Sequence, residues 1–412
     1  MAQVGDTAIE MEPLLPPAVT SYDASPPAAG PCPATSTIGD VAPCTAAYSM
    51  DRALYSYYGG PLYQVKRASD GTTRDIGLLS AGGYVNAFEQ DSFCGNTPCT
   101  ITKLYDQSPM WNDLTVAPGG GAATSPDQPA SATALPITVN GHKAYGVDIE
   151  PGMGYRNNVT QGIAVNGQPE GMYMVASGTH ANPACCFDFG NGEANSIDNH
   201  AAHMDAVNLS TTCWPGGQCT GNGPWVQADL EDGLFMGAKN TNLANLGNSS
   251  DFVTALLKNN GQTTFALKGG NAQAGGLSTW HDGPLPSDPV SYAPMKQEGG
   301  IILGTGGDNS NWGTGSFFEG VMTAGYPSDA ADNAVQAGIV AAGYAGNSAG
   351  VSAVASAAGP AVAHDGYTSV YTVDAGGEPG VTAGDLQETF LPALGAGWTT
   401  QDLSKLYQVP TV

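Results

Sequence analysis

Residues 225–235 read WVQADLEDGLF, and their alternation decides the fold class. Successive side chains of a β-strand point to opposite faces of a sheet. One face of this strand is apolar and consists of Val226, Ala228 and Leu230. The opposite face carries an aromatic ring, an amide and two carboxylates, on Trp225, Gln227, Asp229 and Glu231. We expect a strand over 225–235 that enters a core on one side and faces a polar cleft or solvent on the other.

The whole chain has the composition of a turn-rich, strand-rich protein. Its 412 residues include 57 glycines and 29 prolines, and only 12% are charged. This composition indicates strands and turns rather than helices. We therefore predict an all-β fold, with enough length for one large domain and a small one.

The net charge of −25, from 12 basic and 37 acidic residues, excludes two classes of partner. Without basic patches, nucleic acid and anionic membranes are poor partners. No run of 18 apolar residues occurs, so we expect no transmembrane helix. The first residues, MAQVGDTAIE, lack the basic and apolar regions of a signal peptide, which we take to be absent from this chain.

The eight cysteines fall into four local couples, which are Cys32 and Cys44, Cys94 and Cys99, Cys185 and Cys186, and Cys213 and Cys219. This predicts four short-loop disulfides and a secreted, extracellular protein, although eight cysteines allow 105 connectivities. A bond between the neighbours Cys185 and Cys186 closes a small ring, and such strain clusters at functional sites. Zinc is the rival interpretation, because His200 and His203 form H-x2-H. The couples lack a C-x2-C rhythm, so we expect no metal.

Three other segments carry local signals. Residues 45–59 read as a helix, and residues 251–270 read as a hairpin around the turn-forming cluster Asn259-Asn260-Gly261. Residues 328–344 read as a closing helix with Ser328 as N-cap and an apolar stripe of Val335, Ile339 and Val340.

Changes in amino-acid composition and hydrophobic pattern divide the chain into four parts. Residues 1–30 are rich in Pro and Ala and are expected to form a disordered leader, and residues 31–345 form the main domain. Residues 346–363 form an Ala/Ser/Gly linker. Residues 364–412 return to strand-like alternation and resemble one repeat of bacterial propeller-type lectins. A lone blade cannot close a propeller, so we expect a small C-terminal β tail.

A second acid stands in a different kind of segment. The apolar run Ile301–Leu303 is followed by glycines and then by DNSN (308–311), which is either a plain turn or a place where a ligand approaches the backbone. Two acids on separate segments of an acidic β-rich protein suggest glycoside hydrolysis. Retaining enzymes hold two carboxyl groups about 5–5.5 Å apart, and inverting enzymes about 6.5–9.5 Å.

Long collinear motifs carry a resemblance. They are RALYS (52–56), LYDQS (104–108), NGHKAYGV (140–147), GYRNN (154–158), EGMYMV (170–175), ACCFDFGN (184–191), GPWVQADLEDGLF (223–235), EGGIILGTGGDNSN (298–311) and FFEGVMTAGYPSD (317–329). Together they resemble the catalytic domain of glycoside hydrolase family 54, the α-L-arabinofuranosidase B family, over about 31–345. The resemblance implies a two-sheet β-sandwich of the concanavalin or jelly-roll kind and a retaining reaction.

The resemblance also implies roles for single residues. Glu231 corresponds to the nucleophile and Asp308 to the general acid/base. Asp229, Gly307 and Trp214 correspond to sugar-binding positions. The couple Cys185–Cys186 corresponds to a vicinal disulfide against the sugar ring, and the couples Cys32–Cys44 and Cys94–Cys99 to family disulfides.

Two departures from the family pattern lie near these positions. Asp232 stands where the family has Asn, so a contact or a local pKa differs. The segment CWPGGQC (213–219) adds the pair Cys213–Cys219 close to Trp214. We count Asp232 and Asn309, the neighbours of the two acids, among the substrate-binding residues.

The sequence thus predicts an exo-acting, retaining α-L-arabinofuranosidase that releases arabinose from the side chains of arabinoxylan or arabinan. We expect a polysaccharide or oligosaccharide substrate, no cofactor and a monomer. One alternative is a carbohydrate-binding protein with weak activity. Another is the same chemistry on a different furanoside or on a xyloside.

Overall fold

The computed structural model describes residues 32, 42–213, 217–288 and 290–346, and the backbone of 362–364, 367–369 and 408–410. The expected leader 1–30, Trp214, and most of the linker 346–363 and the tail 364–412 lie outside the described residues. In the tail, three short strands form a small sheet of their own, and they are β21 (Val362–His364), β22 (Tyr367–Ser369) and β23 (Gln408–Pro410).

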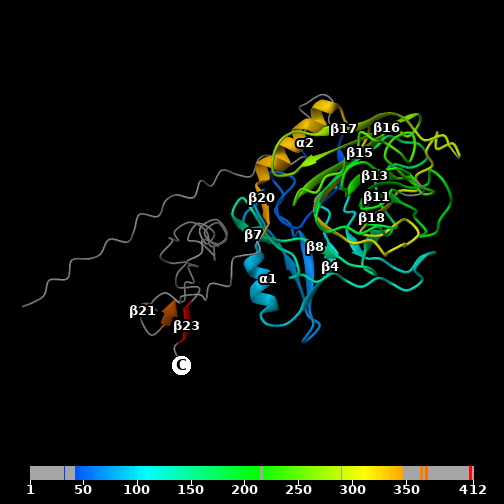
Figure 1. The fold of residues 1–412 in the computed structure, drawn as a ribbon. Coiled ribbons are helices and arrows are strands. Elements are labelled where there is room, and N and C mark those ends of the chain that lie inside the picture. Colours follow the sequence, from blue (N-terminus) through cyan, green and yellow to red (C-terminus); the bar gives the residue numbers. More distant parts are fainter. Residues whose placement is uncertain are drawn as a thin grey trace, which may run out of the picture.

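Two large antiparallel sheets dominate the described part of the chain (Figure 1). The first has the order β1 (Cys44–Ser49), β19 (Gly315–Ala324), β10 (Glu170–Ala176), β15 (Val253–Asn259), β16 (Thr264–Asn271) and β17 (Ser278–Pro284), and β8 (Val147–Ile149) also pairs with β19. The second has ten strands in the order β14 (Leu234–Phe235), β13 (Trp225–Asp229), β12 (Asp205–Ser210), β11 (Asp188–Gly192), β18 (Gly300–Leu303), β9 (Tyr155–Asn157), β5 (Leu114–Val116), β4 (Cys99–Leu104), β2 (Tyr63–Arg67) and β3 (Thr73–Ile76). A small sheet contains β20 (Tyr344–Gly346), β6 (Pro136–Val139) and β7 (His142–Tyr145).

The two large sheets pack face to face around one core. Strands β10 and β15 contact β12 and β13 of the opposite sheet. Phe189 on β11 packs edge-on against Tyr48 on β1, with ring centroids 6.2 Å apart, and lies 5.5 Å from Phe317 on β19. The prediction of an all-β sandwich is therefore confirmed.

The strand prediction for 225–235 is half right. Val226, Ala228 and Leu230 enter the core as expected. The strand ends at Asp229, however, and the segment returns through a turn into β14, with Ala228 paired to Phe235. Asp-Gly is a strong hairpin signal, and Asp232-Gly233 supplies it here. Glu231 lies in this turn, so its position does not follow from strand alternation.

Of the other local predictions, some are confirmed and one is wrong. The hairpin at 251–270 is confirmed as the antiparallel pair β15 and β16. The helix at 45–59 is wrong, because this segment contains the fully buried strand β1 followed by turns. A short helix, α1 (Ala87–Cys94), was not foreseen.

The closing helix is confirmed as α2 (Asp329–Ala342), whose N-cap Ser328 accepts a hydrogen bond from the backbone N–H of Ala331 at 3.2 Å. Its buried face carries Asp332, which lies 2.8 Å from Nζ of Lys258 on β15 and 2.7 Å from Nζ of Lys268 on β16. The paired charges hold α2 beside the first sheet (Figure 1). None of the described helices is long and apolar enough to span a membrane.

A buried ion pair fixes the central strand β19. Nε and Nη2 of Arg52 donate to the two carboxylate oxygens of Glu319 at 2.6 and 2.7 Å, and both side chains are fully buried. The hydroxyl groups of Tyr173 and Tyr344 donate to the same carboxylate at 3.1 and 2.8 Å. Such full pairing is what allows a charge to be kept in a protein core.

Arg52→Met should lower the free energy of unfolding by about 3–5 kcal/mol, because it leaves the Glu319 carboxylate buried without its cation. Urea unfolding followed by circular dichroism measures this. Arg74→Met is the control, since Arg74 pairs with Glu89 at an exposed position. It should change stability only slightly, and a loss as large as that of Arg52→Met would contradict the assigned importance of the buried pair.

Candidate active site

The candidate site lies on the outer face of the ten-stranded sheet, opposite the core. Register places Asp188 on β11 beside Asn208 on β12, and Asn208 beside Gln227 on β13. Nδ2 of Asn208 donates to Oδ1 of Asp188 at 2.7 Å. All three side chains are buried. This polar face is therefore covered, rather than a solvated outer surface of the sandwich.

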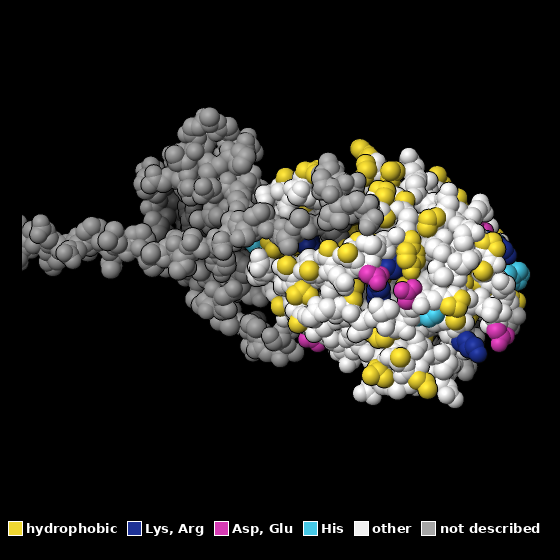
Figure 2. Space-filling model, turned by 90° about the horizontal axis from the view of Figure 1, so that it is seen from above, with side chains coloured by type: hydrophobic (Ala, Val, Ile, Leu, Met, Phe, Trp, Pro, Cys, Tyr) yellow, Lys and Arg dark blue, Asp and Glu magenta, His cyan; other side chains and the backbone are white. Residues whose placement is uncertain are grey.

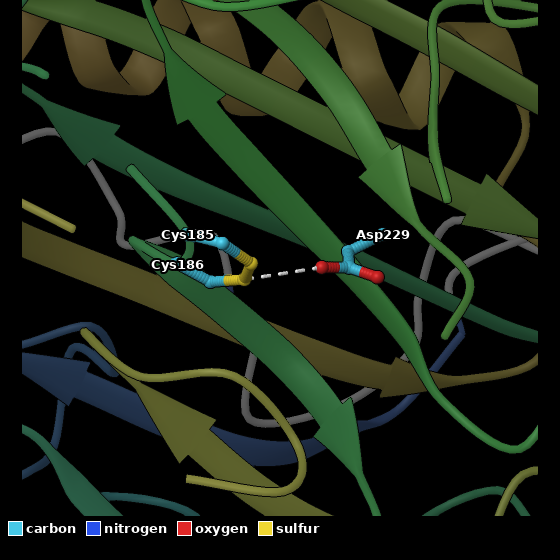
Figure 3. A group of neighbouring side chains, drawn as sticks. All are labelled: Cys185, Cys186 and Asp229. Atoms are coloured by element: carbon cyan, nitrogen blue, oxygen red, sulfur yellow. Dashed lines mark hydrogen bonds between the residues drawn. A yellow bond between two sulfur atoms is a disulfide. The ribbon is translucent and has the colours of Figure 1, made fainter. Parts of the chain in front are cut away.

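The vicinal disulfide Cys185–Cys186 immediately precedes β11, and the peptide bond between the two residues is cis. Sγ of Cys186 lies 3.4 Å from Oδ2 of Asp229, at the end of β13 (Figure 3). It also lies 3.6 Å from Oγ of Ser310. The disulfide thus contacts both segments that carry the predicted catalytic acids. The other disulfides are Cys32–Cys44, Cys94–Cys99 and Cys213–Cys219.

Glu231 is held in the turn between β13 and β14 with a backbone φ of 89°, a value that favours glycine. Its own N–H donates to Oδ1 of Asp229 at 3.1 Å. The N–H of Asn199 donates to Oε1 of Glu231 at 3.2 Å. Oε2 has no hydrogen-bond partner among the described residues. One carboxylate oxygen is thus fixed by a hydrogen bond, and the other is buried without one.

Like charges and burial act on Glu231. Burial raises its pKa to about 8, and the charges of Asp308, Asp232 and Glu298 add to the increase. The hydrogen bond from Asn199 opposes it. The charge of Asp308 is thus one of several that act on this carboxyl group.

Asp229 and Asp188 form a buried carboxyl pair. Both side chains are buried, and each acts on the pKa of the other. Burial raises the pKa of Asp229, and the charge of Asp188 raises it further. Burial also raises the pKa of Asp188, to about 7.

Asp308 lies in the loop between β18 and β19, which crosses from one large sheet to the other. Its Oδ1 accepts a hydrogen bond from the N–H of Ser310 at 3.0 Å, and its carbonyl accepts one from the N–H of Ala122 at 3.0 Å. The loop passes so close to the disulfide that a Cβ on Gly313 would lie 2.4 Å from the carbonyl carbon of Cys186. Gly313 therefore permits this approach.

Two predicted substrate-binding residues, Asn309 and Asp232, are hydrogen-bonded to other groups of the protein. Asn309 is fully buried, its Nδ2 donates to Asp127 and to the carbonyl of Ala123, and its Oδ1 accepts from Thr305. Its amide holds the loop. Asp232 is exposed, and its Oδ2 accepts a hydrogen bond from the N–H of Ala201 at 2.9 Å.

Sequence reasoning missed four residues of the site. Asn199 joins Glu231 to Glu298, since its side-chain amide donates to Oε1 of Glu298. Asp127 and Arg156 contact the loop of Asp308. Asn199, Asp127 and Glu298 stand in loops, and Arg156 stands on the interior strand β9. Arg156 and Glu298 lie in the quoted family motifs, but only the hydrogen bonds show their roles.

The described residues contain three groups with metal-ligand side chains. Cys185, Cys186 and Asp229 form one, but a disulfide offers no thiolate. In the second, Nδ1 of His180 lies 3.4 Å from Asp148 and its Nε2 lies 3.3 Å from Glu150. Each nitrogen faces a different carboxylate, which is an ion-pair geometry. The third, Asp198, His200 and Asp232, is exposed throughout.

Figure 2 shows a face on which uncharged side chains predominate and only a few charged ones occur. Much of the negative charge that matters for the site is instead buried, in Asp188, Asp229 and the half-buried Glu231.

Comparison with known proteins gives the same family throughout. A family model for the catalytic part of alpha-L-arabinofuranosidase B matches residues 31–345. The alpha-L-arabinofuranosidase B of Emericella nidulans is 54% identical over 324 residues, which cover 77% of this chain and 62% of that protein. An arabinofuranosidase/B-xylosidase of Trichoderma koningii is 53% identical over 327 residues, covering 77% and 63%. The chain thus spans less than two thirds of these relatives.

Solved structures of arabinofuranosidases also superpose on this chain. An arabinofuranosidase complexed with arabinofuranosyl-alpha-1,2-xylobiose superposes with a TM-score of 0.73 at 43% identity, covering 84% of this chain and 75% of that one. A family 54 α-L-arabinofuranosidase soaked with a cyclic sulfate inhibitor gives 0.72 at 46% identity, covering 81% and 73%.

The buried acids should make the protein most stable at acidic pH. A carboxyl group whose pKa is higher in the fold than in the unfolded chain binds its proton more tightly in the fold, so stability falls as pH rises between the two values. For Asp51, Asp188 and Asp205, each raised to about 7 mainly by burial, this window runs from about pH 4 to pH 7. Below about pH 4 the exposed Asp329, whose pKa is lowered by Lys258 and Lys268, acts in the opposite direction.

Tm should therefore decrease from about pH 4 to pH 7. Asp188→Asn should flatten the decrease, because it removes one titrating group and the charge that raises the pKa of Asp229. Differential scanning fluorimetry across pH measures this. Asp251→Asn, at an exposed position, is the control and should leave the slope unchanged. A slope of equal size in the Asp188 variant would contradict the assignment.

Proposed function

The chain belongs to the α-L-arabinofuranosidase B catalytic family over residues 31–345, and from this we propose that it is an exo-acting, retaining α-L-arabinofuranosidase. The observation that carries the proposal is the contact of Cys186 with Asp229 and with Ser310, which brings the segments of Glu231 and Asp308 to the same disulfide. The substrates we propose are arabinofuranosyl side chains of arabinoxylan or arabinan. A solved relative bound to an arabinofuranosyl xylobiose supports this choice.

Glu231 attacks the anomeric carbon through its unpartnered oxygen and forms a covalent glycosyl-enzyme ester. Asp308 protonates the glycosidic oxygen as the bond breaks. It then takes a proton from the water that hydrolyses the ester, and arabinose leaves with its anomeric configuration retained. The disulfide provides a flat, polarisable surface for the furanose ring.

We also propose where the protein acts and how its chain is divided into domains. We propose secretion, which four disulfides support because such bonds persist in oxidising compartments. We also propose the division into a leader (1–30), a catalytic domain (31–345), a linker (346–363) and a lectin-like tail (364–412). The alternation of sequence in the tail supports the last part.

The direct test is hydrolysis of 4-nitrophenyl α-L-arabinofuranoside, followed by proton NMR to identify the anomer first released. The wild-type protein should release the α anomer. Glu231→Gln should lower kcat at least about 10³-fold, because an amide is not a nucleophile here. Wild-type hydrolysis with inversion would overturn the retaining mechanism, and a Glu231→Gln protein of wild-type rate would overturn the nucleophile assignment. Arabinoside binding without turnover would favour a carbohydrate-binding protein instead.

The pH profile of kcat/KM tests the electrostatics of Glu231. The reaction needs one of the two catalytic carboxyl groups protonated and the other ionised. Because the two groups interact, the observed pKa values are properties of the pair. The last proton leaves near pH 8, the pKa of Glu231, so kcat/KM should fall above that pH. Asp232→Asn removes one charge that raises this pKa and should move the alkaline limb down by roughly half a unit.

Asp198→Asn is the matched control, because Asp198 is a neighbouring exposed acid that is not among the main influences on the pKa of Glu231. Its profile should overlay that of the wild-type protein. An unmoved or upward-shifted limb in Asp232→Asn would show that Asp232 does not act on Glu231.

A further inference from the structure

The loop that carries Asp308 is held from behind by a residue of another segment. Nδ2 of Asn309 and Nδ2 of Asn311 both donate to Oδ1 of Asp127, at 3.0 and 2.6 Å. All three side chains are buried, and Asp127 retains only 5% of its exposed area. Hydrogen bonds to a buried carboxylate are strong, so this contact fixes the residues on both sides of Ser310.

Asp127 is itself anchored. Its N–H donates to the carbonyl of Ala117 at 2.9 Å, and the next N–H, of Gln128, donates to the carbonyl of Gly152 at 2.8 Å. Gly152 in turn donates to the carbonyl of Asn311 at 2.7 Å. The contact therefore connects the loop to the body of the ten-stranded sheet rather than to another mobile side chain.

Arg156 completes the support on the other side of Asp308. Its Nη1 donates to the carbonyl of Gly307 at 2.8 Å, and its Nη2 donates to the carbonyl of Glu193 at 2.6 Å. Burial raises the pKa of Asp127, and the hydrogen bonds from Asn309 and Asn311 and the charge of Arg156 oppose this increase. The residues before and after Asp308 are thus each held by a buried polar or charged group. Among the described residues, the Asp308 carboxyl itself is hydrogen-bonded only within its own turn, to the N–H of Ser310.

We propose that Asp127 is a positioning residue that sets the place of the Asp308 carboxyl relative to the glycosidic oxygen, an inference that rests on the proposed function. A general acid acts only within about 2.6–3.2 Å of the atom it protonates. A displacement of about 1 Å can cost roughly 10²-fold in rate. Asp127 does not touch the substrate and acts through Asn309 and Asn311.

The test compares two aryl α-L-arabinofuranosides. Departure of a weakly acidic phenol needs protonation by Asp308, whereas departure of 2,4-dinitrophenol, a much stronger acid, does not. In Asp127→Ala, kcat/KM for the phenyl glycoside should fall by roughly 10²-fold and that for the dinitrophenyl glycoside by less than about threefold. Asp127→Asn keeps an oxygen that can accept both amide hydrogen bonds, and it should recover most of the phenyl glycoside activity.

Asp106→Ala is the matched control. Asp106 is also buried and also anchors a turn, through the N–H groups of Ala47, Ser108 and Asn112. Its loss should lower Tm without changing the ratio between the two substrates. If Asp127→Ala does not fold, Asn311→Ala removes one of the two donors and should give the same selective loss in smaller size.

The outcomes distinguish failure of the inferred role of Asp127 from failure of the proposed function. An equal loss on both glycosides in the folded Asp127 and Asn311 variants, or no loss, would overturn the role of Asp127 while leaving the proposed function intact. A wild-type protein that cleaves neither glycoside would overturn the proposed function and this inference together.

Discussion

The loop between β18 and β19 ties the chemistry of the site to the packing of the whole sandwich. It leaves the ten-stranded sheet at Leu303 and enters the other sheet at Gly315. The place of Asp308 therefore depends on how the two sheets lie against each other. The aromatic contacts of Phe189 join the two sheets, and the buried pair of Arg52 and Glu319 holds β19 in place.

Burial of several acids on the outer face of one sheet has two physical effects. Desolvation disfavours each charge, and like charges nearby disfavour it further, so protons remain bound to higher pH. Burial raises the pKa values of Asp188, Asp229 and Glu231 in this way. The arrangement costs stability at neutral pH, and it also raises the pKa of the proposed nucleophile. Stability and the pH range of activity therefore both depend on the burial of acids on this face.

Much of the architecture could be predicted from local pattern, because alternation and turn chemistry act over a few residues. The hairpin at Asn259-Asn260-Gly261 and the cap at Ser328 are examples. The helix expected at 45–59 failed because burial in the sandwich overrode local periodicity. The buried face of α2 was misjudged for a related reason. Its Asp332 is satisfied by lysines on two distant strands, which no local pattern reveals.

The candidate site likewise contains residues that the sequence locates and residues that it does not. The two acids and the adjacent cysteines lie in motifs that a family resemblance can locate, but their supports are single side chains distant in sequence. Glu231 depends on Asn199 and Glu298, and Asp308 depends on Asp127.

We propose that these two groups of supports, which hold the two acids from different segments of the chain, set the gap between the two carboxyl groups. The gap decides whether a water molecule fits between nucleophile and sugar. In the retaining mechanism that we propose, these remote supports, rather than the catalytic residues themselves, let the nucleophile reach the sugar directly.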